Sequence, residues 1–151
     1  MRRKRLALGC TLVLMAAGLA WAQKEKSLDS GKKAGLYAEL AQAPEKARAR
    51  RNPLESDPDA LPAGRKLFER HCAQCHGETG EGTKKAPSLR APEVLGATPG
   101  TLFWVMTNGV VRSGMPVWSK LPEAQRWQIV RFVKSLGPAP PVKPEPTSPP
   151  R

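Results

Sequence analysis

The segment Cys72-Ala73-Gln74-Cys75-His76 constrains this chain more than any other feature of its sequence. Two thiols that are separated by two residues on one helical turn can each form a thioether to one edge of a porphyrin. The imidazole that follows can then ligate the iron. The C-x-x-C-H pattern therefore predicts one covalently attached haem c, with Cys72 and Cys75 as the thioether residues and His76 as an axial ligand.

Three other interpretations of the motif are open from the residues alone. A structural zinc site needs four ligands, and beyond the motif the chain offers only His71, which directly precedes Cys72. A thioredoxin-like dithiol needs a βαβ context that the sequence lacks, and a plain disulfide between Cys72 and Cys75 leaves His76 without a role. Each alternative explains less of the sequence than haem attachment does.

The N-terminal residues have the pattern of an export signal. Four basic residues, 2–5, precede an apolar stretch from Leu6 to Ala20, and Ala20-Trp21-Ala22 supplies the small residues of a cleavage site. We therefore expect residues 1–22 to be a signal peptide, with an uncleaved membrane anchor as the alternative. The expected location is the periplasm, with the protein either soluble or anchored by this segment. Cys10 falls within the apolar stretch and is expected to have no role.

Composition divides the rest of the chain into three parts. Residues 23–59 have mixed charge and one weak helical pattern that Pro44 interrupts, which predicts a linker or a strap. Residues 60–137 contain most of the aromatic side chains and therefore the core, and we expect them to form the haem domain. Residues 138–151 are rich in proline, which predicts a disordered tail. A core this small is marginal alone, so a covalent cofactor would also stabilise it.

Helical periodicity occurs three times within residues 60–137. A first helix is predicted over about 60–75 with Asp59 as its N-cap. A second is predicted over about 99–108, capped by Thr98 and ended by Gly109, and a third over about 122–136. No window alternates with a period of two residues. The predicted fold class is therefore all-α, with three or more helices and long loops wrapped around the haem.

The candidates for the second axial position of the iron are Met106, Met115, His71 and the lysines. Met106 lies on the apolar face of the second predicted helix and is expected in the core. Met115 lies in the extended loop Ser113-Gly114-Met115-Pro116, which follows His76 at a distance that lets the chain reach the opposite face, and it is the expected sulfur ligand. His71 shares the face of His76, so it cannot ligate from the other side.

These features together resemble a class I monohaem cytochrome c over residues 60–137. The resemblance implies that the first and last helices cross near Gly64, Phe68 and Phe132, and that the Pro87 carbonyl accepts the Nδ1 proton of His76. Leu121 departs from the family pattern where a capping Ser or Thr is common, so a weaker start of the last helix is expected. The matching features are Gly64, Phe68, the C-A-Q-C-H segment, Pro87, Gly109, the Gly114-Met115-Pro116 loop and the Trp127 to Leu136 helix.

Ligation by His76 and Met115 leaves no open coordination position on the iron. The sequence therefore predicts a periplasmic one-electron carrier and not an enzyme. Two alternatives remain, namely a fixed cytochrome c subunit of a larger redox complex and a five-coordinate haem enzyme or sensor. Nothing in the family pattern accounts for residues 23–59.

The charge of the chain bears on its partners. The net charge is +12, and Lys84, Lys85 and Arg90 follow the haem motif closely. Such a cluster is either ordinary solvated surface or a rim that steers partners. The partners expected on the second interpretation are acidic or membrane-bound redox proteins, a donor and an acceptor, with association to a membrane surface as a further option. Nucleic acid is not expected as a partner, because export would separate the protein from the usual nucleic-acid targets.

Overall fold

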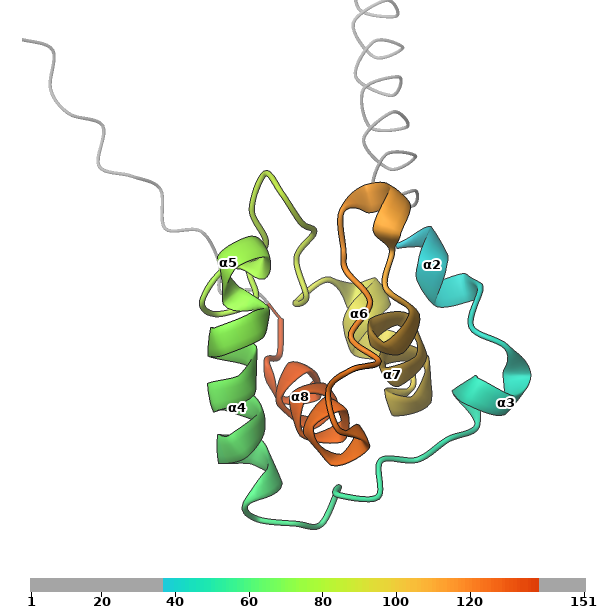
Figure 1. Ribbon diagram of the computed structural model, residues 1–151, viewed down its shortest axis with the longest axis vertical. Coiled ribbons are helices and arrows are strands. Elements are labelled where there is room, and N and C mark those ends of the chain that lie inside the picture. Colours follow the sequence, from blue (N-terminus) through green and yellow to red (C-terminus); the bar gives the residue numbers. More distant parts are fainter. Residues whose placement is uncertain (1–36, 139–151) are drawn as a thin grey trace, which may run out of the picture. The chain divides into compact units, whose positions relative to one another are not determined.

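The computed structural model describes residues 37–138, and their regular structure is helical (Figure 1). None of these residues forms a strand, although Val110 and Met115 make an isolated bridge. The predicted all-α fold is confirmed. The helices are α2 (Ala38–Ala41), α3 (Glu45–Arg48), α4 (Ala60–His71), α5 (Ala73–His76), α6 (Pro92–Gly96), α7 (Pro99–Asn108) and α8 (Glu123–Ser135), with a 3-10 turn η1 (Val111–Ser113).

The chain divides into two compact units, Met1–Ala38 and Glu39–Arg151. Nearly all described residues belong to the second unit, and the description below concerns that unit. The expected signal segment, residues 1–22, and nearly all of the expected tail lie outside the described residues, as do residues 23–36 of the expected linker. No helix within residues 37–138 combines the length and apolarity that crossing a bilayer requires.

The most extensive helix pair is α4 with α8, which Figure 1 shows side by side. A Cβ atom at Gly64 would lie 2.0 Å from the backbone oxygen of Gln128, so only glycine allows the two backbones to approach this closely. One turn further along α4, the rings of Phe68 and Phe132 pack with their centroids 5.1 Å apart. The predicted crossing near these residues is confirmed.

The rest of the core lies between α7 and α8. Phe103 of α7 stacks on Trp127 of α8, with ring centroids 4.0 Å apart and an interplanar angle of 19°. Met106 is 6% exposed, as expected for a core methionine. The remaining apolar side chains buried in the described residues are Ala43, Ala47, Ala60, Phe68, Val94, Ile129, Val130 and Val133.

The helix ends agree with the sequence in part. Thr98 caps α7 by accepting a hydrogen bond from the Thr101 amide at 3.2 Å, and Gly109 follows its last residue with φ of 66°, as predicted. Asp59 occupies the predicted N-cap position of α4, but not as a side-chain cap. Its side chain makes no capping hydrogen bond, and the Asp57 carboxylate instead accepts from the Asp59 amide at 2.9 Å. The side chain of Asp57 therefore closes a local turn just before α4.

Of two further helix boundaries, one differs from expectation and one agrees with it. The first predicted helix breaks at Cys72, whose φ of −119° separates α4 from α5. The start of α8 has no side-chain cap, as expected from Leu121, because Pro122 precedes it. The Nε of Arg126 donates to the Leu121 carbonyl at 3.1 Å, which ties the segment before α8 to the first turn of the helix.

Residues 39–58, here called the N-terminal strap, pack against α7 and α8. The Ala47 carbonyl lies so close to Gly100 that a Cβ there would be 2.0 Å from its oxygen, and Thr98 Oγ1 donates to the Arg48 carbonyl at 2.9 Å. These contacts seat α3 across the N-terminal end of α7. The short helices α2 and α3 flank Pro44, where the sequence predicted an interruption.

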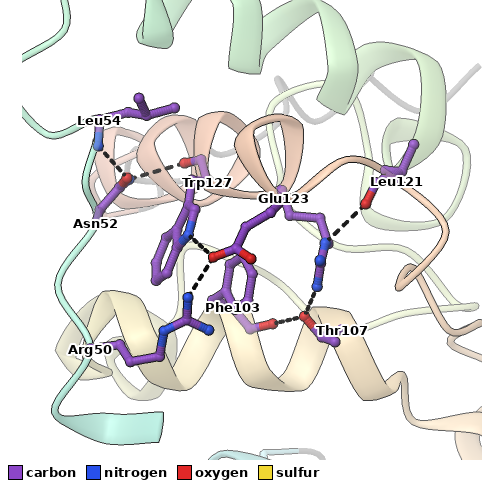
Figure 2. Close-up of polar contacts among 9 residues, drawn as sticks. Arg50, Asn52, Leu54, Phe103, Thr107, Leu121, Glu123 and Trp127 are labelled. Carbon is purple, nitrogen blue, oxygen red and sulfur yellow. Dashed lines mark hydrogen bonds and ion pairs between the residues drawn. The ribbon is translucent and has the colours of Figure 1, made fainter.

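Polar side chains of the strap also reach the core (Figure 2). The guanidinium of Arg50 lies over the rings of Phe103 and Trp127, at 4.6 and 5.0 Å from their centroids, and makes an ion pair with Glu123 at 2.6 Å. Asn52, which is 6% exposed, donates from Nδ2 to the Trp127 carbonyl at 3.0 Å. The strap is therefore part of the folded unit around α8.

Candidate haem-binding site

The two cysteines of the motif lie at the junction of α4 and α5. Cys72 occupies the break between the helices, Cys75 lies within α5, and both are free thiols. Burial, with a smaller contribution from Cys75, raises the pKa of Cys72 to about 12. Because redox-active dithiols depend on a lowered cysteine pKa, this environment does not suit thioredoxin-like chemistry.

His76 ends α5 with a fixed ring orientation. Its Nδ1 donates to the Pro87 carbonyl at 2.9 Å, which leaves the lone pair on Nε2. Burial lowers the pKa of His76, although the hydrogen bond to Pro87 acts in the opposite direction. The imidazole is therefore neutral at neutral pH and presents Nε2 as a ligand atom.

The loop after α5 returns to the motif through a series of hydrogen bonds. The His76 carbonyl accepts from the Gly82 amide at 2.7 Å, and the Cys75 carbonyl accepts from Thr83 Oγ1 at 2.6 Å. The Leu89 amide donates to the Gly80 carbonyl at 2.8 Å. This folding brings Pro87 against His76, although the two are eleven residues apart.

Met115 lies in a loop that is closed by its own backbone and tied to α7 by one hydrogen bond. Val110 and Met115 exchange two backbone hydrogen bonds, of 3.0 and 3.2 Å, and the Trp118 amide donates to the Met106 carbonyl at 3.2 Å. At Gly109 a Cβ would lie 2.7 Å from the backbone of Pro116, so a side chain at this position would displace the residue after Met115. Met115 itself is half-buried.

Trp118 connects the Met115 loop to the haem motif. Its ring lies 5.4 Å from that of His71, measured between centroids, and His71 is the last residue of α4 before Cys72. The structure therefore brings the Met115 loop and the C-x-x-C-H segment to the same part of the fold. This contact was missed by the sequence reasoning, because nothing local to Trp118 indicates its partner.

The donor set of these residues fits a haem c. It contains two unoxidised thiols at the right spacing, a neutral imidazole with a free Nε2, and a methionine in a tethered loop. Several residues of this region are half-buried and not fully covered by protein, as a surface that faces a planar group would be. Within residues 37–138 no group of three or more His, Cys, Asp and Glu side chains converges as a metal site, so the described residues offer no zinc set.

The structure revises the basic cluster after the motif. Lys84 and Lys85 are exposed, but Arg90 is engaged with the backbone. Its Nε donates to the Thr79 carbonyl at 2.6 Å and its Nη1 to the Leu136 carbonyl at 2.5 Å. Arg90 therefore holds the C-terminal end of α8, which is a structural role that neither interpretation of the cluster included.

Comparisons with known proteins identify relatives of this domain. The family model described as cytochrome c oxidase, cbb3-type, subunit III matches residues 59–133. A CcoP subunit of a cbb3-type cytochrome c oxidase from Rubrivivax gelatinosus is 32% identical over 133 residues, which are 86% of this chain and 41% of that protein. A CcoP subunit from Azospirillum sp. (strain B510) is 32% identical over 96 residues, 57% of this chain and 32% of that protein.

A solved structure also resembles the fold. The crystal structure of cytochrome CL from the methylotroph Methylophaga aminisulfidivorans superposes with a TM-score of 0.51 and 30% sequence identity, over 58% of this chain and 59% of that one. The fold, the donor set and these comparisons define a small all-α electron-transfer domain that binds haem. More specifically, residues 59–133 form a cytochrome c domain, whose family implies a covalently bound haem c. The chain spans less than half the length of the CcoP relatives it matches.

Proposed function

We propose that this chain relays single electrons outside the cytoplasm through one haem c. Cys72 and Cys75 would hold the group through thioethers, and His76 Nε2 and Met115 Sδ would be the two ligands that the protein offers to its iron. The hydrogen bond from His76 Nδ1 to the Pro87 carbonyl carries the proposal, because it fixes the tautomer that a ligating histidine needs. When bound, the haem supplies reversible one-electron exchange between Fe(III) and Fe(II).

The protein's own residues have three tasks in this proposal. Pro87 keeps the His76 imidazole oriented, while burial favours its neutral form. The backbone pairing of Val110 with Met115 and the hydrogen bond from Trp118 to α7 limit the positions that the Met115 sulfur can occupy. Packing of Trp118 on His71 holds the Met115 loop against the end of α4, next to Cys72. Together these contacts favour a site that changes little in geometry when its charge changes.

A near-infrared absorption spectrum of the ferric holoprotein tests the ligand assignment. A methionine sulfur on ferric haem gives a weak charge-transfer band, and this band is expected in the wild type and should disappear in Met115→Ala. Met106→Leu, a volume-conserving change in the core, is the matched control and should keep the band. If the wild-type spectrum instead shows five-coordinate iron, the carrier function is rejected in favour of a haem enzyme or sensor.

A second candidate is a fixed subunit of a larger redox complex. The similarity to CcoP subunits of cbb3-type oxidases favours it, and so does a strap that lies outside the residues matched by the family model. Native gel filtration of detergent-solubilised membranes and of the soluble periplasmic fraction, followed by haem staining, distinguishes the two. A free carrier is expected at the size of a small monomer in the soluble fraction, whereas a subunit should migrate with a membrane complex. The same fractions report whether residues 1–22 act as a cleaved signal or as an anchor.

A further inference from the structure

The N-terminal strap contacts the turn that precedes Met115. Glu39 of α2 forms an ion pair and hydrogen bond with Nη2 of Arg112, the central residue of η1. Arg112 lies three residues before Met115, inside the short loop that the paired backbones of Val110 and Met115 close. The strap thus contacts the tip of the loop that carries the proposed sulfur ligand.

The tip of this loop has little packing of its own. Val111 is 69% exposed, and residues 112–114 are exposed as well. Gly114 adopts a left-handed conformation with φ of 86°, and a Cβ added to it would have no neighbouring atom within 4 Å. The backbone pairing of Val110 with Met115 closes the loop but does not attach its tip to the rest of the fold. A side-chain contact from another element is therefore well placed to restrict its motion.

The strap can act as a firm attachment for this contact. Glu39 has a side chain only 19% exposed, whereas that of Arg112 is 70% exposed. Ala43 and Ala47 follow Glu39 in the strap and are buried, and Asn52 is hydrogen-bonded to the Trp127 carbonyl. Glu39 therefore belongs to a segment that is anchored at intervals by buried residues, while Arg112 belongs to a turn whose residues are exposed.

We propose that Glu39 is a positioning residue that acts through Arg112 to keep the Met115 loop closed over the site. This inference rests on the proposed function, because it concerns the retention of Met115 as a ligand. Glu39 touches neither the reacting atoms nor the haem. It lies outside the residues that the cytochrome family model matches, so the contact is a property of this chain's strap.

Binding of cyanide to the ferric holoprotein measures this role. Cyanide must displace Met115, so at saturating cyanide the binding rate reports how often the loop opens. Ion pairs with one exposed partner have modest strength, so Glu39→Gln and Arg112→Gln are each expected to raise the rate about two- to fivefold. The double variant should show no further increase, and the swapped pair Glu39→Arg with Arg112→Glu should return the rate towards the wild type.

Two controls exclude general effects of charge. Glu69→Gln breaks the comparable ion pair of Glu69 with Arg65, 3.0 Å long on the surface of α4, and should leave the cyanide rate unchanged. Raising the salt concentration should bring the wild-type rate towards that of Glu39→Gln while it changes the variant less. A rate that is equal in the wild type and in both single variants, or effects that add in the double variant, would overturn the proposal.

The near-infrared band separates failure of this inference from failure of the proposed function. If the wild type lacks the band, Met115 is not a ligand and both are overturned. If the band is present and the cyanide rates do not respond to Glu39, only the positioning role is overturned. The band should also persist in Glu39→Gln at neutral pH, because that substitution changes how often the loop opens and not which residue ligates in the closed state.

Discussion

Gly64 of α4 and Gln128 of α8 approach so closely that a single added methyl group has no room between them. A Cβ at residue 64 would lie 2.0 Å from the Gln128 carbonyl oxygen and 3.2 Å from Cβ of Phe132. Because the first obstacle is a backbone atom, no side-chain rotation relieves the clash. The crossing of the two helices therefore depends on the absence of a side chain at residue 64.

The substitution Gly64→Ala should destabilise the holoprotein by about 1–3 kcal/mol, because the helices must separate to admit the methyl group. Chemical denaturation followed by circular dichroism measures the loss. Gly96→Ala is the matched control, since a Cβ there has no neighbour within 4 Å. It should cause no loss of stability, and equal effects of the two substitutions would contradict the close helix crossing.

The strap gives a second stability prediction. Asn52→Ala should lower the free energy of unfolding by about 1–3 kcal/mol, because it removes a buried hydrogen bond to the Trp127 carbonyl and the turn at the Leu54 amide. Its neighbour Arg51 is exposed, so Arg51→Ala should change stability by less than about 0.5 kcal/mol. Urea denaturation midpoints compare the two variants. If neither variant is less stable than the wild type, the strap does not belong to the folded unit.

Glu123 gives a prediction about pH. Hydrogen bonds from Trp127 Nε1 and from Arg50 hold the pKa of its carboxyl below the usual value of 4.5. A carboxyl with a depressed pKa adds stability above its unfolded pKa, and this contribution disappears as the pH falls through the folded pKa. Glu123→Gln should therefore lower the denaturation midpoint at pH 7, and the difference from the wild type should shrink progressively below pH 4.5.

The control for this experiment is Glu93→Gln, which changes an exposed carboxyl on α6. It should leave the midpoint close to that of the wild type at pH 7. A difference between Glu123→Gln and the wild type that stays constant down to strongly acidic pH would show that the carboxylate contributes no charge-dependent stability at this site.

Lys84 and Lys85 allow a test of electrostatic steering. If these exposed lysines attract acidic redox partners, replacing both by glutamine should slow bimolecular electron transfer severalfold at low salt and make its dependence on ionic strength shallower. Stopped-flow measurements with an acidic acceptor protein give the rates. Lys120→Gln, at another exposed position, is the control. Rates that do not depend on salt in the wild type would exclude steering.

Much of the fold could be predicted from sequence because the signals are local. The extent of α7 could be predicted from its helical periodicity, from the cap at Thr98 and from the stop at Gly109. The spacing of apolar residues predicted α8 in the same way. The crossing of α4 with α8 followed from the family resemblance that rests on Gly64 and Phe68. The motif likewise indicated the site, because its chemistry depends on residues that are adjacent in the sequence.

The predictions failed where a side chain's partner is far away along the chain. Arginine is usually a surface residue, and nothing near Arg90 in the sequence indicates otherwise. Its guanidinium nevertheless bonds to the Leu136 carbonyl at the end of α8, 46 residues further along the chain. Contacts of Arg50 with Glu123 and of Glu39 with Arg112 span 73 residues each, and no periodicity signals them. Asp59 failed as a cap for a different reason, since the side chain of Asp57 forms a competing local turn by accepting from the Asp59 amide.

The central claim is that Cys72 and Cys75 carry the haem covalently. Intact-mass spectrometry of the holoprotein under denaturing conditions tests it most directly, because a thioether survives unfolding whereas a coordinate bond does not. We expect the mass of the polypeptide plus one haem, lost only when both cysteines are replaced by serine. Recovery of the unmodified polypeptide mass from cells that mature other c-type cytochromes would contradict the claim.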